Sequence, residues 1–107
     1  MPIIRIDYDK EQIESEEVLR LSHALRDIVS EVTGIQEVFV YADSHEITIK
    51  ADPLEIFIEM SAHLATDVDA LMEEIKKRLS AWKAEVGFTT PINLTIIPMQ
   101  WKIEIGI

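Results

Sequence analysis

The sequence contains no cysteine and few positive charges among its 107 residues. Without cysteine, disulfides, thiolate catalysis and cysteine-ligated zinc are excluded. Ten lysines and arginines stand against 20 aspartates and glutamates, so the formal net charge is -10. This field repels phosphate backbones and no basic stripe offsets it locally, so nucleic acid is not an expected partner.

Long apolar runs and glycine-rich loops are also missing. No apolar stretch approaches the roughly 20 residues that span a membrane, and the N-terminus lacks the basic and then apolar pattern of a signal peptide. The three glycines, Gly34, Gly87 and Gly106, are too dispersed for a phosphate loop or a nucleophile elbow. We therefore expect one cytoplasmic domain, residues 1–107, with no cofactor and no membrane partner.

Metal chemistry and a shared-proton carboxylate pair also lack support in the residue spacing. His23, His45 and His63 are scattered and share no ligand spacing with a third group, so no metal site is expected. Glu55 and Glu59 fall on one face of an expected strand, but about 13 Å apart from the rise per residue, which is too far for one proton to be shared.

Two stretches carry apolar residues at helical spacing. The first predicts a helix over residues 16–33, with Ser15 as N-cap and Gly34 as the left-handed C-cap residue. The second predicts a helix over residues 67–86, capped by Thr66 and ended by Gly87. Acidic residues precede each apolar stripe, as the helix dipole favours.

In four other stretches, residues of two kinds alternate at every second position, which predicts strands. They cover residues 1–8, 37–43, 54–62 and 92–97. Pro98 is expected to break the fourth. Residues 47–51 predict a short strand or an extended loop, and residues 101–107 a last short strand, in which Trp101 is interpreted as an interface anchor.

The order of these elements repeats itself. Strand, helix and strand over residues 2–42 are followed by the same series over residues 53–97. Each helical crossover returns the chain parallel to its first strand. The sequence thus predicts an α+β fold: duplicated βαβ units forming a four-stranded mixed sheet, both helices on one face, and a short C-terminal strand. The other face, to which Phe57 belongs, needs a second layer or an oligomer.

The proline after the initiator methionine has two interpretations. A proline at the first position of a strand is common, because no ladder hydrogen bond is lost there. Alternatively, removal of Met1 leaves Pro2 as a secondary amine on a rigid strand, and such an amine can transfer protons near neutral pH.

These features together resemble a known group. A Met-Pro start, a βαβ–βαβ duplication of this length and a trailing strand resemble the tautomerase superfamily. The arrangement is most similar to that of macrophage migration inhibitory factor, where one chain carries both units, and within it to an uncharacterised bacterial branch. The resemblance implies a homotrimer with a central barrel of sheets, and a proline-dependent tautomerase or isomerase of a small carbonyl or enol compound.

The resemblance also implies roles for individual residues. Pro2 matches the general base, and the candidate substrate-binding residues are Arg5, Ser61, Ala62 through its backbone N–H, Asn93 and Thr95. The position after the glycine that ends the first helix often holds a lysine in the family, and here it is Ile35. Two alternatives stay open: a non-catalytic oligomer that retains the fold, and a ferredoxin-like interaction module, which shares the split βαβ pattern.

Overall fold

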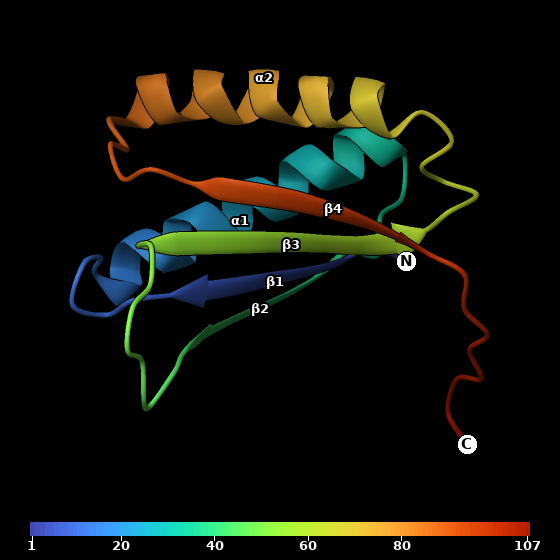
Figure 1. The fold of residues 1–107 in the computed structure, drawn as a ribbon. Helices are drawn as coiled ribbons and strands as arrows, with labels where there is room; N and C mark the ends of the chain where they lie inside the picture. Colours follow the sequence, from blue (N-terminus) through green and yellow to red (C-terminus); the bar gives the residue numbers. More distant parts are fainter.

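The computed structural model describes residues 1–107 as two layers, a sheet and a pair of helices (Figure 1). The first βαβ unit consists of β1 (Ile3–Tyr8), α1 (Ser15–Thr33) and β2 (Phe39–Ser44). The second consists of β3 (Leu54–Ser61), α2 (Val68–Val86) and β4 (Asn93–Met99). The predicted duplication is therefore confirmed.

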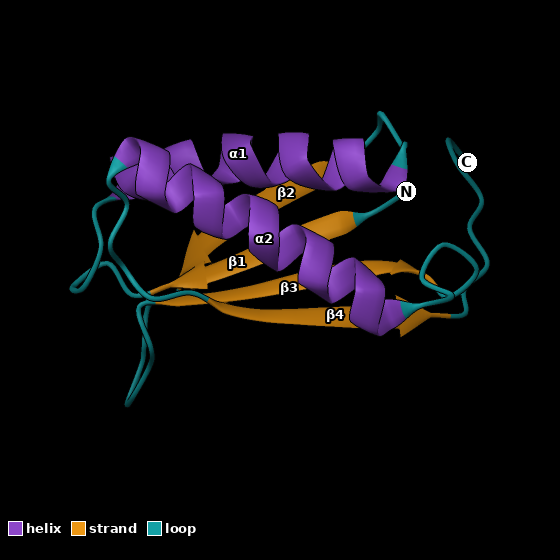
Figure 2. Cartoon of the chain, turned by 90° about the horizontal axis from the view of Figure 1, so that it is seen from above, coloured by secondary structure: helices purple, strands orange, loops and turns teal.

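The four strands form one mixed sheet in the order β2-β1-β3-β4. The strands within each unit are parallel, and the two units join through the antiparallel pair β1–β3. Both helices cover the same face, as the view from above shows (Figure 2). The predicted fold class is confirmed, and no helix is both long and apolar enough to cross a bilayer.

Alternation along the strands divides the sheet into two chemically different faces. The face under the helices holds the core, and most of its strand side chains are completely buried: Ile4, Ile6, Leu54, Ile56, Ile58 and Met60. The other face, called the open face below, has no second layer in the chain. It carries Phe57 as predicted, with the exposed Phe39, Tyr41 and Ile97.

Both helix starts differ by one position from the sequence interpretation. Ser15 is the first helical residue of α1, and Glu14 occupies the N-cap without a side-chain bond. Asp67 rather than Thr66 caps α2, and its Oδ1 accepts the N–H of Ala70 at 3.0 Å. A carboxylate is as good a cap as a hydroxyl, so composition alone does not separate adjacent capping residues.

The fourth strand continues through its proline. Pro98 lies opposite Met60 and the strand ends at Met99, so the expected break is wrong. β4 lies at the edge of the sheet and pairs with β3 alone. A proline is tolerated in such a strand, because on the free side there is no neighbouring strand that needs its missing N–H.

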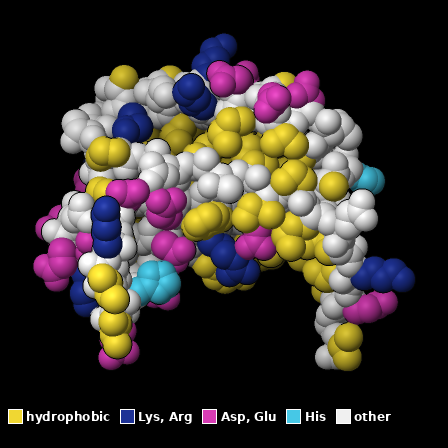
Figure 3. Space-filling model, in the orientation of Figure 1, with side chains coloured by type: hydrophobic (Ala, Val, Ile, Leu, Met, Phe, Trp, Pro, Cys, Tyr) yellow, Lys and Arg dark blue, Asp and Glu magenta, His cyan; other side chains and the backbone are white.

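Two segments that alternate in sequence form no strand in the single chain. Residues 47–51 belong to a loop whose Ile47 and Ile49 are 85% and 101% exposed. Residues 101–107 leave the sheet as an extended segment, called the C-terminal segment below, without a pairing partner. Both project beyond the open face, with apolar side chains near their tips (Figure 3). The expected C-terminal strand is thus absent from the isolated chain, since a strand requires a neighbour to bond to.

Candidate functional site

The N-terminal end of β1 places Pro2 inside the molecule. Pro2 is fully buried, and alternation puts it on the helix-covered side together with Ile4. Its carbonyl oxygen accepts the N–H of Phe39 at 3.1 Å. The antiparallel register pairs Ile3 with Glu59. If this register is extended towards the N-terminus, the first further pair is Pro2 with Met60 and the second is Met1 with Ser61.

A small hollow opens at this same end of the sheet, where β3 and β4 end. It has a volume of ≈ 360 Å³ and is called the strand-end hollow below. Its lining comes from the turn after β3 and from the residues that leave β4: Ser61, Ala62, His63, Met99, Gln100 and Trp101. Because Met1 lies beside Ser61 in the continued register, removal of Met1 would bring the Pro2 nitrogen to the border of this hollow.

The backbone donors of the hollow differ from the sequence prediction. The N–H of Ala62, expected to meet a substrate, already donates to the carbonyl oxygen of Met99 at 2.9 Å. The next N–H, that of His63, makes no hydrogen bond within the chain. The free donor is therefore one residue later than predicted. Only the turn after β3, where the Leu64 N–H bonds back to the Ser61 oxygen at 2.9 Å, reveals which N–H stays free.

Arg5 lies on the open face, away from Pro2. Its guanidinium Nε donates to Oε1 of Glu59 and its carbon Cζ lies 5.8 Å from the centre of the Tyr41 ring. Both interactions hold the cation over the sheet, by ion pairing and by the ring quadrupole. In the single chain, Arg5 and Pro2 are therefore separated by the sheet itself.

Asn93 and Thr95 also lie on the open face. Thr95 faces Phe57, in the middle of the sheet. Asn93 begins β4, five residues before Pro98, so it lies about 16 Å along the sheet from the level of Pro2. Its Nδ2 donates to Oδ2 of Asp52 at 2.9 Å. One chain thus brings together Pro2, Ser61 and Ala62, and does not bring Arg5, Asn93 or Thr95 to them.

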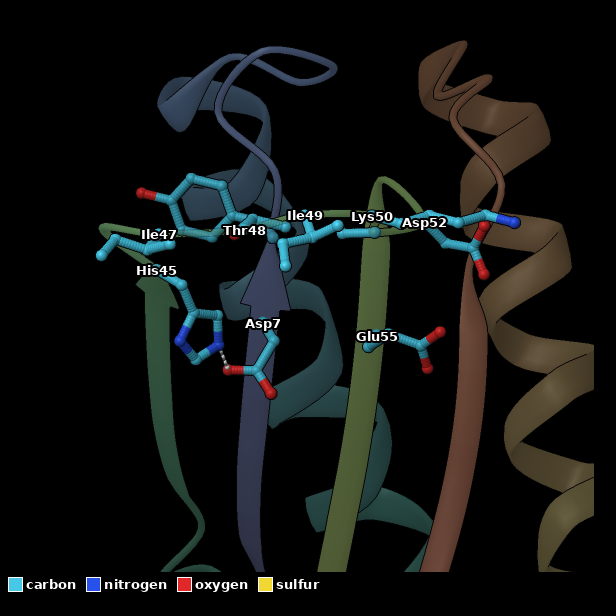
Figure 4. A pocket seen from close by; sticks show the side chains of 10 residues that line it. Asp7, His45, Ile47, Thr48, Ile49, Lys50, Asp52 and Glu55 are labelled. Atoms are coloured by element: carbon cyan, nitrogen blue, oxygen red, sulfur yellow. Dashed lines mark hydrogen bonds and ion pairs between the residues drawn. The ribbon is translucent and has the colours of Figure 1, made fainter.

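A larger hollow lies at the opposite end of the sheet, beneath the loop 45–52 (Figure 4). It measures ≈ 640 Å³ and collects three carboxylates, Asp7, Asp52 and Glu55. Asp7 pairs in register with Asp43 and with Glu55, so like charges face one another across three strands. No prediction from the sequence included this acidic row, although Asp7, Asp43 and Glu55 occupy alternating positions of their strands that share one face.

Two contacts hold the acidic hollow together. His45 Nε2 lies 3.1 Å from Oδ1 of Asp7, and Asn93 Nδ2 also donates to Oε1 of Glu55 at 2.7 Å. No group of three histidine, aspartate or glutamate side chains converges in a way that would hold a metal ion. This end of the sheet is therefore strongly negative, and it lies far from Pro2.

Comparison with known proteins identifies the fold. No family model matches the sequence, and no curated protein matches it. Solved structures do match. FG41 malonate semialdehyde decarboxylase inhibited by 3-bromopropiolate has a TM-score of 0.66 at 16% identity, with 97% of this chain and 90% of that chain covered. A fused 4-OT symmetric trimer gives 0.64 at 12% identity, with coverages of 98% and 94%.

A third similar structure is the macrophage migration inhibitory factor-like protein of Entamoeba histolytica. Its TM-score is 0.58 at 20% identity, and the match covers 96% of this chain and 95% of that chain. These structures belong to the tautomerase superfamily. The chain therefore has the tautomerase fold, in the arrangement where one chain carries both βαβ units.

Proposed function

We propose that the mature protein begins at Pro2 and uses its secondary amine as general base in a tautomerisation or isomerisation of a small carbonyl or enol compound. The observation that carries this proposal is the placement of Pro2. It is buried immediately before the first residue of the central strand β1, at the end of the sheet where the strand-end hollow opens, in a tautomerase fold. An apolar environment lowers the pKa of an amine, because desolvation disfavours its charged form.

The proposed reaction is a proton relay without a cofactor. The Pro2 nitrogen takes the proton from the enol oxygen, the C–O bond becomes the carbonyl double bond, and the electron pair of the C=C bond takes a proton from the resulting ammonium group at the α-carbon, so charge and atoms balance. Meanwhile the hydroxyl of Ser61 and the free N–H of His63 donate to the substrate oxygen, which carries the charge that develops. Ala62 contributes by holding this turn against Met99.

The test begins with the intact mass of untagged protein, which should lack Met1. Phenylenolpyruvate, an anion, and its uncharged methyl ester are then used as the first probes, and the ketonisation of each is followed by absorbance. With at least one of them we expect a rate clearly above that of buffer and of the Pro2→Ala variant. Retention of Met1 on the whole population, or equal rates for both proteins with both probes, would refute the proposal.

We further propose that the protein is a homotrimer. The open face exposes Phe39, Tyr41 and Ile97, and the unpaired C-terminal segment alternates three exposed isoleucines with Lys102 and Glu104. Such a segment satisfies its backbone by pairing with another chain. In a trimer, Arg5, Asn93 and Thr95 would take part in a site only when supplied across a subunit boundary.

The C-terminal segment provides a matched test of this assembly. Light scattering during size-exclusion chromatography should give three times the chain mass of 12.3 kDa. Replacing Ile103 and Ile105 by serine should shift the protein towards monomer, because the apolar side of the strand is lost. Replacing Lys102 and Glu104 by serine keeps the apolar side of the strand, so this variant should remain a trimer. A monomeric wild type would instead favour the ferredoxin-like module.

The non-catalytic alternative has one specific observation in its favour. The only basic side chain of β1, Arg5, is already bound by Glu59 and Tyr41. An oligomer that kept the fold without turnover would show the trimer mass and no rate above the Pro2→Ala variant.

A further inference from the structure

The strand-end hollow has one titratable side chain in its lining, that of His63, and no lysine or arginine. Its six lining residues include no lysine, arginine, aspartate or glutamate. Met99 and Trp101 supply apolar and aromatic surface, whereas Ser61 and Gln100 supply neutral polar groups. The volume of ≈ 360 Å³ lies at the lower end of the range for small-molecule sites. This composition suits a compact ligand with one aromatic or aliphatic part and one polar oxygen.

The positive charges of the chain lie elsewhere. Arg5 pairs in register with Phe57, four residues along β3 from Ser61, does not line the hollow and is held by Glu59. Lys102 follows Trp101 in the sequence but does not line the hollow. The remaining cations belong to the two helices and to the loops at the far end of the sheet, at positions 10, 20, 26, 50, 76, 77, 78 and 83. Apart from His63 and the Pro2 amine, which the proposed function uses unprotonated as a base, a carboxylate in the hollow would therefore find no ion-pair partner within the chain.

Negative charges are closer. α2 begins five residues after His63, and a helix N-terminus ordinarily favours an anion. Here Asp67 already occupies that position, with its carboxylate accepting the Ala70 N–H at 3.0 Å, and Asp69 follows in the first turn. The net charge of -10 adds a repulsive field of long range. An anionic ligand would thus lose hydration without gaining a lysine or arginine counter-charge.

We propose that the strand-end hollow selects uncharged carbonyl or enol compounds, such as ketones, aldehydes and esters, and rejects carboxylates. This inference rests on the proposed function for its site. It separates this chain from the FG41 decarboxylase, which is inhibited by the carboxylate 3-bromopropiolate. The substrate oxygen is held by neutral donors, the His63 N–H and the Ser61 hydroxyl, and the apolar part lies against Trp101 and Met99.

A pair of ligands that differ only in charge tests the selectivity. Phenylpyruvate and its methyl ester share the ring and the ketone, but only the first is an anion at pH 7. Calorimetry on the untagged protein should give an ester dissociation constant at least tenfold below that of the acid. Equal affinities, tighter binding of the acid, or binding of neither would overturn the inference.

Turnover of the same pair separates this inference from the proposed function. We expect kcat/KM for ketonisation of the enol ester to exceed that of the enol acid at least tenfold, each relative to its uncatalysed rate. Ester that binds but is not turned over above the Pro2→Ala variant would refute proton transfer and leave the selectivity standing. Faster turnover of the acid would refute the selectivity and leave proton transfer standing.

A charge placed in the hollow should reverse the preference. Gln100→Lys adds one cation to the lining, and the ratio of acid to ester affinity should rise at least tenfold. Gln100→Met keeps the length and neutrality of the side chain and should retain the ester preference. Ala81→Lys, on the exposed surface of α2, adds the same net charge away from the hollow and should not change the ratio. An equal change in Ala81→Lys would show a general field effect and overturn the local explanation.

Discussion

Adding one glycine before Pro2, so that the mature chain begins Gly-Pro, is expected to lower kcat/KM by about 10²–10⁴, the usual contribution of a general base. The extension turns the Pro2 nitrogen into an amide, whose lone pair is delocalised and no longer basic. Every side chain of the protein stays in place. The measurement is the ketonisation rate of the preferred enol substrate, after mass spectrometry has verified the N-terminus of each sample.

Two comparisons make this result specific. The structure already accommodates a residue before Pro2, since Met1 is present and Pro2 is buried behind it. The extended protein should therefore retain its denaturation midpoint. Pro2→Ala keeps a primary amine on a less rigid start and should fall between wild type and the extended form. Full activity of the Gly-Pro protein would show that the Pro2 nitrogen is not the base.

Replacing Ile58 by alanine is expected to reduce the free energy of unfolding by about 2–5 kcal/mol, the cost of a large-to-small change in a core. Ile58 is 0% exposed and lies in β3, between Ile4 of β1 and Ile96 of β4. The lost methyl groups leave a cavity in the middle of the sheet, where the two units join. Urea denaturation at one fixed protein concentration measures the effect, because assembly contributes to the apparent stability.

Leu19→Ala is the control for this core substitution. Leu19 is 60% exposed on α1, so its truncation removes little buried surface and should change the free energy of unfolding by about 0.5 kcal/mol or less. A similar loss in both variants would mean that the helix-covered face of the sheet is not the main core.

Much of the fold follows from local patterns. The apolar stripe of α1 and the left-handed Gly34, with φ of 73°, set one helix and its end. The alternation in β3 separates Ile56 and Ile58 from Glu55 and Phe57, and both faces agree with that pattern. These patterns depend on side chains within a few residues of one another, so they can be interpreted without knowledge of the partners.

The incorrect predictions concern segments whose structure depends on a neighbouring strand. Pro98 was expected to stop a strand, but its place on the edge strand β4 lets pairing continue to Met99. The C-terminal segment alternates like a strand, yet no neighbour within the chain is available to it. The same limit applies to the loop 45–52, whose Ile47 and Ile49 face solvent in the single chain.

The candidate site was only partly accessible from sequence. Pro2, Ser61 and Ala62 were predicted to share a site, and they lie at one end of the sheet. Whether Asn93 belongs to that end depends on the direction and register of two strands about 30 residues apart in the chain. The bond between the Ala62 N–H and Met99 was equally invisible, because it forms between chain segments that meet only after folding.

By itself, the sequence determined the duplication, the two helices, the alternating faces and a proline at the start of the first strand. Each of these depends on periodicity or on the conformational limits of one residue type. Only the tertiary structure decided that Pro2 is buried at the sheet end where a hollow without lysine, arginine or carboxylate side chains opens, that Arg5 is bound to Glu59 on the open face, and that the free donor belongs to His63. Those facts depend on strand register, which long-range pairing of β1 with β3 sets and which no local pattern encodes.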